Sequence, residues 1–118
     1  MSWLNSAPLL LLERYLDVTT MRQTLVTTNL ANIDTPGYHT RDVDFRGELQ
    51  RAMNGEDTGL TNPFVMPVRG LIARPDGNNV SVDREAMLLA EVQLQFKAAT
   101  AVIRSQFAQL STAIREGQ

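Results

Sequence analysis

Apolar residues recur on a seven-residue stride near both ends of this chain, and the middle of the chain lacks that pattern. Such a stride puts one side chain every two turns on the same face of a helix, which makes a stripe that another helix can pack against. The front stripe consists of Leu4, Leu11, Val18 and Leu25, and the back stripe consists of Leu89, Phe96, Ile103 and Leu110. We therefore expect a long helix at each end of the chain.

Local signals set the limits of these helices. The first is predicted over residues 6–32, with Ser6 as N-cap and Pro8 in the first turn. It must end before Thr35, because the residue before Pro36 is pushed out of the α region. The second is predicted over residues 81–115, with Ser81 or Asp83 as N-cap.

The chain between the helices reads as turns and short extended pieces. Pro36-Gly37 fits the centre of a type II turn, in which Gly37 takes a positive φ. Residues 41–45 alternate as an extended segment does, residues 46–53 favour a short helix, and residues 54–62 form a polar loop.

The predicted fold is mainly α, with long N- and C-terminal helices that pack as a coiled-coil-like pair around a short extended or loop middle. We divide it into an N-terminal axial helix (1–35), a middle segment (36–80) and a C-terminal axial helix (81–118), all in one structural unit. The seam predicted for subunit packing is Leu11, Val18, Leu25, Leu89, Val92, Phe96, Ile103, Phe107 and Leu110. A lone pair of helices would leave much of this seam uncovered, so we expect the termini to be disordered in the free monomer.

Composition excludes several classes of protein. The chain of 118 residues has no cysteine, which rules out disulfides and thiolate metal sites. Its net charge of −2 argues against nucleic-acid binding. The apolar run at residues 9–12 is far shorter than the roughly 20 residues that span a bilayer, so we expect no direct membrane insertion. No cationic region precedes this run, and we expect an N-terminus that is not cleaved.

Few residues suggest chemistry. His39, Asp42 and Asp44 form the single grouping that resembles metal ligands, but alternation in a strand puts His39 on the opposite face from the two aspartates. We favour a solvated strand edge over a metal site. There is no glycine-rich phosphate loop and no nucleophile next to an available histidine. The sequence predicts no enzyme, no cofactor and no metal.

Two asparagines near the end of the first helix have two interpretations. Asn32 lies on the seven-residue stride after Leu25, where a buried asparagine would set the register and partner number of a coiled coil. Alternatively, Asn29 and Asn32 cap a fraying helix end. Spacing alone does not separate these interpretations.

The stretch from Thr28 to Tyr38 resembles the N-terminal signature of the bacterial flagellar rod, hook and hook-filament axial proteins. Residues 38–45 and 76–87 resemble the proximal-rod members in particular, whereas residues 46–75 match weakly. The matching signature residues are Asn29, Leu30, Ala31, Asn32, Thr35, Pro36, Gly37 and Tyr38. The resemblance implies that these residues serve structure and subunit contact.

The resemblance also implies a function. Proteins of this family are structural subunits without enzymatic activity, exported unfolded by the flagellar type III apparatus without cleavage. They polymerise with other rod proteins into a hollow shaft that transmits torque. The proximal rod lies in the periplasm near the inner-membrane ring and its rod adaptor. We therefore expect this chain in the flagellar basal body, with those components as partners.

Two alternatives remain. A sibling rod protein of the same family is disfavoured by residues 94–98, which lack that protein's characteristic element. A soluble coiled-coil adaptor or export chaperone would be a stable, fully helical dimer in dilute solution, which circular dichroism and sedimentation would reveal.

Overall fold

The fold is mainly helical, as predicted. The computed structural model describes residues 7–55 and 65–117. Its elements, in chain order, are α1 (Ala7–Ala31), β1 (Arg41–Val43), α2 (Phe45–Met53), β2 (Val65–Pro67) and α3 (Val82–Glu116). The two long helices contain 25 and 35 residues, and the middle contributes only one short helix and two short strands.

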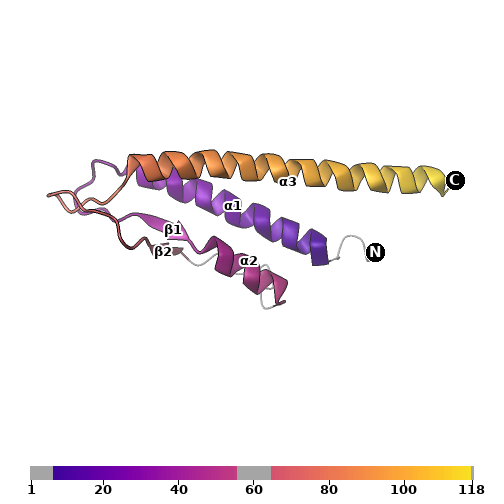
Figure 1. The fold of residues 1–118 in the computed structure, drawn as a ribbon, viewed down its shortest axis with the longest axis horizontal. Helices are drawn as coiled ribbons and strands as arrows, with labels where there is room; N and C mark the ends of the chain where they lie inside the picture. Colours follow the sequence, from indigo (N-terminus) through magenta and orange to yellow (C-terminus); the bar gives the residue numbers. More distant parts are fainter. Residues whose placement is uncertain (1–6, 56–64, 118) are drawn as a thin grey trace.

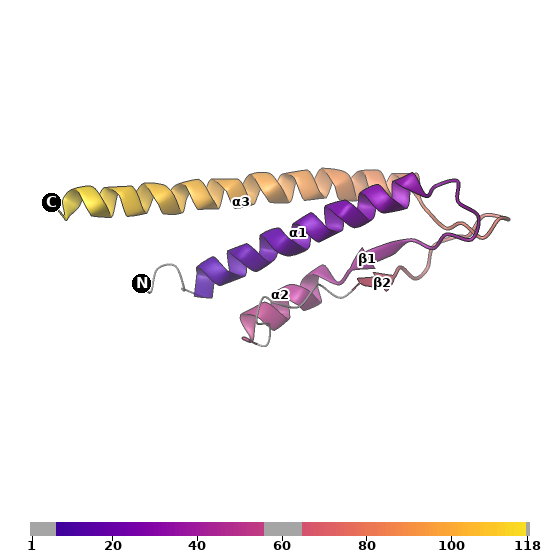
Figure 2. The same cartoon turned by 180° about the vertical axis from the view of Figure 1, so that it is seen from behind.

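The molecule is elongated, with extents of 69 × 27 × 17 Å. Figures 1 and 2 show α1 and α3 running antiparallel, close together where they join the middle segment and farther apart towards the termini. The two strands and α2 lie on the other side of α1, so α1 is the central element. The side of α3 that faces away from α1 is uncovered in both views.

Both long helices end where local signals predict. α1 ends at Ala31, four residues before Thr35, and Pro8 lies in its first turn. The predicted N-cap Ser6 and the stripe residue Leu4 lie outside the described residues. At the start of α3, the Ser81 hydroxyl accepts a hydrogen bond from the Arg84 amide at 3.3 Å, so Ser81 rather than Asp83 is the N-cap.

The middle segment forms a two-stranded antiparallel sheet, in which Asp42 lies opposite Met66. The extended segment predicted over residues 41–45 was wrong at its end, because Phe45 begins α2. The physical reason is Asp44, whose carboxylate accepts a hydrogen bond from the Gly47 amide and caps the helix. The short helix predicted over residues 46–53 is confirmed. Most of the predicted loop over residues 54–62 lies outside the described residues.

The apolar core lies between α1, β1 and the start of α2. Val18, Leu25 and Val43 are its buried centre, and Met21, Phe45 and Val65 pack around them. Tyr15 and Phe45 meet edge to face, with ring centroids 5.4 Å apart. Along α3, by contrast, Ala99 is the last buried residue before Gly117. The core therefore supports only the first half of α3.

Candidate assembly site

The connection after α1 is a tight turn that reverses the chain. The Tyr38 amide donates to the Thr35 carbonyl at 3.2 Å, and Gly37 takes φ +75° between them. This is the type II turn predicted for Pro36-Gly37, because only a residue without Cβ takes this φ readily. Thr35, Pro36 and Gly37 are exposed, so the turn is presented at the surface at one end of the molecule.

Asn29 is buried and joins α1 to the segment that follows the turn. Its amide nitrogen donates to the Arg41 carbonyl at 2.9 Å. Its carbonyl oxygen accepts from the Tyr38 hydroxyl at 2.8 Å and from the Arg41 amide at 3.2 Å. Neither interpretation from spacing describes Asn29, because its partners are in β1 and the turn rather than in a facing helix or at its own helix end.

Asn32 does cap the helix end. Its side-chain amide donates to the Thr28 carbonyl at 2.8 Å, and its side-chain oxygen accepts from the Thr35 hydroxyl at 3.0 Å. It is half-buried, and within the described chain these contacts are local rather than to another helix. These contacts support the capping interpretation of Asn32, and its place on a coiled-coil seam between copies stays a prediction.

Two asparagines ahead of α3 complete a cluster with Asn29 and Asn32, which we call the asparagine cluster (Asn29, Asn32, Asn78 and Asn79). The Asn78 amide donates to the carbonyls of Asn32 and Thr35 at 2.8 and 2.9 Å. The Asn79 side chain accepts from the Thr40 amide at 2.6 Å. The end of α1 and the entry to α3 are thereby joined by side-chain hydrogen bonds across more than forty residues of sequence.

A close backbone contact reinforces this junction. The Gly37 amide donates to the Asp76 carbonyl at 2.8 Å. A Cβ at Gly77, which has φ +87°, would lie 3.3 Å from the Gly37 Cα. Glycine at position 77 therefore lets the two turns touch, whereas a Cβ at Gly37 would meet no atom within 4 Å. Arg74 also donates to the Ile33 carbonyl from the second turn.

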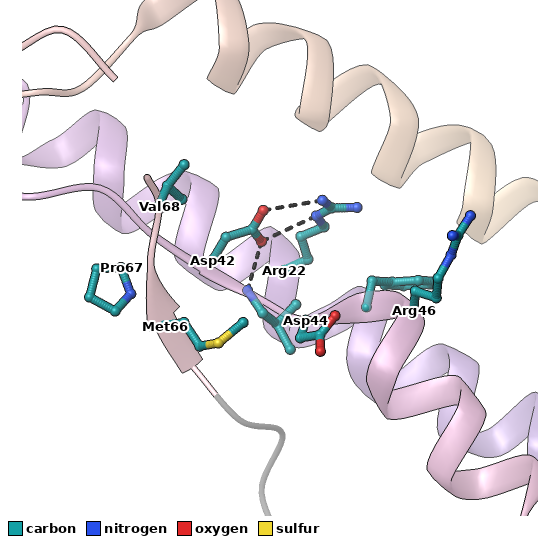
Figure 3. Close-up of a pocket in the computed structure, with 9 residues that line it drawn as sticks. Arg22, Asp42, Asp44, Arg46, Met66, Pro67 and Val68 are labelled. Atoms are coloured by element: carbon teal, nitrogen blue, oxygen red, sulfur yellow. Dashed lines mark hydrogen bonds and ion pairs between the residues drawn. The ribbon is translucent and has the colours of Figure 1, made fainter. Parts of the chain in front are cut away.

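Asp42 links three elements through ion pairs. It accepts two hydrogen bonds from the Arg22 guanidinium of α1, at 3.2 and 3.1 Å, as Figure 3 shows. It also pairs with Arg84 of α3 at 2.7 Å, and Arg84 pairs with buried Glu85 at 2.8 Å. Since charge-assisted bonds to one carboxylate are directional, this network sets how α1, β1 and α3 lie together.

A second ion pair attaches α2 to α1. Arg14 donates to Glu48 at 2.8 Å, and both side chains are almost fully buried. Arg51 of α2 also pairs with Glu48. A buried pair of this kind is costly to break from one side only, because the remaining charge loses its partner.

Two of the three residues considered for metal binding have structural roles. Asp42 is engaged by two arginines, Asp44 caps α2, and His39 is exposed. Within residues 7–55 and 65–117, no group of three or more histidine, aspartate or glutamate side chains is arranged to hold a metal. An open groove of about 420 Å³ runs between Arg22, residues 42–46 and residues 66–68, and Figure 3 shows Asp42 bonded to Arg22 in its lining.

The predicted seam is buried unevenly. Val18, Leu25 and Val92 are buried, whereas Leu11, Leu89, Phe96, Ile103 and Leu110 are half-buried and Phe107 is 59% exposed. The single copy thus covers the seam fully at Val18, Leu25 and Val92, covers most of the rest in part, and leaves Phe107 open. Among the signature residues, Leu30 is half-buried and Ala31 is exposed.

The chain resembles curated rod proteins over most of its length, although no known family model matches it. It is 30% identical to the flagellar basal body rod protein FlgB of Salmonella typhimurium, over 89% of this chain and 91% of that protein. It is 33% identical to FlgB of Borrelia hermsii and 29% identical to FlgB of Escherichia coli, with similar coverage. The chain belongs to the FlgB family. It is a structural protein of the flagellar basal body rod.

Family membership confirms the resemblance inferred from the signature and favours the rod function over a soluble adaptor or chaperone. The structure also explains why the resemblance to the FlgB family is carried by two stretches that are far apart in the sequence. Residues 28–38 and 76–80 meet in the asparagine cluster, so they form one site rather than two.

Sequence reasoning missed several residues of this FlgB-family site. Arg22 and Arg84 were not singled out, Asn78 and Asn79 were noted only within the resembling stretch 76–87, and Arg14 was not paired with Glu48. One signal was available for Arg14, which lies between Leu11 and Val18 on the apolar stripe. A charge at such a position indicates a buried partner. No comparable local signal identifies the partners of Asn78, because they lie in the distant Asn32–Thr35 segment.

Proposed function

We propose that this chain is a proximal-rod subunit that polymerises with itself and with other axial proteins into a hollow, torque-transmitting shaft. Its FlgB relatives are named as basal body rod proteins, which supports a place in the rod. The observation that supports polymerisation is the exposure of apolar side chains on α3. Large apolar side chains of this helix remain in contact with water in the single copy, including Leu94, Val102 and Ile114.

We propose that the exposed side of α3 packs against protein rather than against lipid. By length and composition alone, α3 could cross a membrane, since an 18-residue stretch has a mean hydropathy of 1.3 and is only 17% buried. One such helix is weak evidence for a span, and half-buried seam residues alternate with exposed charges such as Lys97 and Arg104. A helix whose apolar residues are interrupted by charges on an exposed side suits packing between other helices.

The asparagine cluster and the Pro36-Gly37 turn are, in this proposal, structural rather than catalytic. They hold the ends of α1 and α3 at a defined angle and separation, and a repeating assembly requires the same geometry in every copy. The seam from Leu11 to Leu25 and from Leu89 to Leu110 supplies apolar contact within and between subunits. Asp42 and Asp44 already serve as ion-pair and capping groups. We infer that the chain has no enzymatic activity and no cofactor.

Position and partners follow from the same proposal. We expect export by the flagellar type III apparatus without cleavage, and assembly in the periplasm near the inner-membrane ring and its rod adaptor. The nearest competing assignment, a FlgC-like sibling in the same rod, predicts a different axial position. Images of purified basal bodies with the chain labelled distinguish the two assignments.

The test is complementation of a strain that lacks this gene. The wild-type chain is expected to restore rods and swimming, and the Gly37→Val variant is expected to restore neither, because a β-branched residue resists φ +75°. Gly55→Val is the matched control, since Gly55 has φ +72° but lies outside the asparagine cluster. Normal rods in the deletion strain would contradict the proposed function.

A further inference from the structure

The face of α3 that points away from its buried side is patterned for contact. Met87 and Leu94 are 64% and 68% exposed, and Ala101 and Ala108 continue their seven-residue stride. Leu88, Val92 and Ala99 form the buried side of the same helix. At 3.6 residues per turn, the stride from Met87 lies roughly opposite to Val92. We call this uncovered stride the outer face of α3 (Met87, Leu94, Ala98, Ala101, Ser105 and Ala108).

α1 has a corresponding uncovered stride, which we call the outer face of α1 (Leu10, Glu13, Asp17, Thr20, Thr24, Thr27 and Ala31). All seven residues are exposed. The threonine hydroxyls donate to carbonyls four residues earlier in the same helix, at 2.9 Å for Thr20, 3.2 Å for Thr24 and 2.9 Å for Thr27. Their hydrogen-bonding needs are therefore met without water, and the face can pack against another helix without burying an unpaired hydroxyl.

Threonine is also a poor choice for a helix face that only meets water. It has lower helix propensity than alanine, lysine or glutamate, because its branched Cβ restricts rotamers in a helix. Three threonines on one uncovered face, with their hydroxyls bonded to the helix itself, fit a contact surface that admits a close neighbour.

The charges on the two outer faces are opposite. Glu13 and Asp17 are on the outer face of α1, whereas Lys97 and Arg104 flank the outer face of α3. All four are exposed, and none forms an ion pair among residues 7–55 and 65–117. Pairing α3 with a second α3 would bring lysine and arginine together, and pairing α1 with α1 would bring the acids together. Only an α1 face against an α3 face joins unlike charges.

The spacing of these charges fits side-by-side copies with little axial shift. Within one copy, Arg22 of α1 lies beside Glu91 of antiparallel α3, at 3.9 Å. Every helix rises about 1.5 Å per residue, so equal numbers of residues span equal lengths along the two antiparallel helices. Asp17 lies five residues before Arg22 in α1. It is therefore level with the residue five positions after Glu91 in α3, which is next to Lys97. By the same count, Glu13 lies within about one turn of Arg104.

We infer that the outer face of α1 in one copy packs against the outer face of α3 in a second copy of this chain. This inference depends on the proposed rod function and names the surfaces through which copies meet. The contact joins two different surfaces, so it repeats around a ring or along a helix rather than closing a dimer. The strands and α2 lie on the side of α1 away from α3 (Figures 1 and 2), and they leave all seven residues of the outer face of α1 exposed for this contact.

Charge reversal tests the inference in the complemented deletion strain. The Lys97→Glu/Arg104→Glu variant is expected to lose intact rods, as is the Glu13→Lys/Asp17→Lys variant. Combining all four changes is expected to restore rods, because the unlike pairs are rebuilt in the opposite sense. Arg46→Glu, which reverses an exposed charge on α2, is the matched control and is expected to assemble normally. Restoration by the combined variant also shows that the single reversals do not act by unfolding the chain.

Cysteine cross-linking in assembled rods identifies the neighbour directly, because the chain has no native cysteine. The Asp17→Cys/Lys97→Cys chain is expected to form a ladder of chain-to-chain disulfides, and each single variant is expected to form none. A dimer from Lys97→Cys alone, or a cross-link only to another rod protein, would overturn the inference. Normal rods in both reversal variants would also overturn it and leave the rod function intact, whereas rods in the deletion strain would refute that function itself.

Discussion

Asn29 shows how one residue can bind the end of a helix to a strand. It is 1% exposed, and the three hydrogen bonds of its side chain go to Tyr38 or Arg41. A buried amide whose nitrogen and oxygen both form hydrogen bonds is stabilising mainly because the alternative leaves backbone groups of β1 without partners. Asn29 therefore defines the geometry of the junction more than it contributes apolar contact.

We predict that Asn29→Ala lowers the free energy of unfolding by about 1–3 kcal/mol, because the part-buried hydrogen bonds to the Arg41 carbonyl and amide are lost. Urea denaturation followed by circular dichroism measures the change. Thr28→Ala is the neighbouring control, since Thr28 is exposed and its hydroxyl bonds only to its own helix. Equal stability of the two variants would contradict the role given to Asn29.

Tyr38 makes the junction sensitive to high pH. Burial raises the pKa of the Tyr38 phenol above its ordinary value; nearby Arg41 lowers this pKa and Glu85 raises it. A raised pKa in the folded state means that the folded chain keeps its proton when the unfolded chain loses it. Stability should therefore be unaffected below pH about 10 and fall as the pH rises above that value. Burial, and secondarily the charge of Glu91, raises the pKa of Tyr15 in the same direction.

Ultraviolet absorbance of the phenolate, measured alongside thermal unfolding from neutral to alkaline pH, checks this prediction. Tyr38→Phe should reduce the alkaline loss of stability, and Tyr15→Phe should reduce the remainder. If the double variant loses as much stability as the wild type over the same range, other groups cause the alkaline loss.

Among elements, the placement of α1, β1 and α3 depends on one carboxylate. Asp42 faces Arg22 from one helix and Arg84 from the other, and the three side chains are 14–21% exposed. Such partly buried pairs are less screened than surface pairs, so they count for more than an exposed pair would. α2 is attached separately, through buried Arg14 and Glu48.

We predict that Asp42→Asn destabilises the chain by about 2–3 kcal/mol, because two arginines lose a charged partner in a site with little water. Thermal or urea unfolding measures it. Asp34→Asn is the control, as Asp34 lies exposed in the turn after α1 and should change stability by less than about 0.5 kcal/mol. A similar small change for Asp42→Asn would mean that the network does not hold the elements together.

At the scale of the whole molecule, support is concentrated at one end. The asparagine cluster, the ion-pair network and the apolar core all lie towards the junction of the long helices, while α3 continues past its last buried residue, Ala99. An elongated chain whose tertiary contacts are concentrated at one end can bind a neighbouring subunit at its other end. The disorder of the termini expected in the free monomer stays a prediction.

Hydrogen exchange gives the direct test. In the free chain, we expect amides of residues 85–99 to exchange slowly and those of residues 103–116 to exchange much faster, because the latter lack buried side chains. Assembly into rods should slow exchange over residues 103–116. Uniform protection along α3 at low concentration would show that the single copy is already complete, and it would count against assembly-dependent folding.

Several features could be predicted from the residues alone, and each of them is local. The two helices follow from apolar periodicity, the turn from Pro36-Gly37, and the start of α3 from a serine cap. These signals act between residues a few positions apart, so neighbouring residues are enough to predict them. The end of the extended segment was misjudged because Asp44 could have been a strand residue or a cap, and alternation favoured the strand.

Tertiary structure decided everything that depends on partners far away in the chain. Asn78 reaches Asn32 and Thr35, Asp42 joins Arg22 to Arg84, and Arg14 finds Glu48 only after the chain has folded. It also decided which part of the apolar stripe is covered, since Val92 is buried and Phe107 largely exposed although both fit the helical repeat. Periodicity specifies which face of a helix is apolar. How far along the helix that face is covered depends on where the other elements end, which no local pattern encodes.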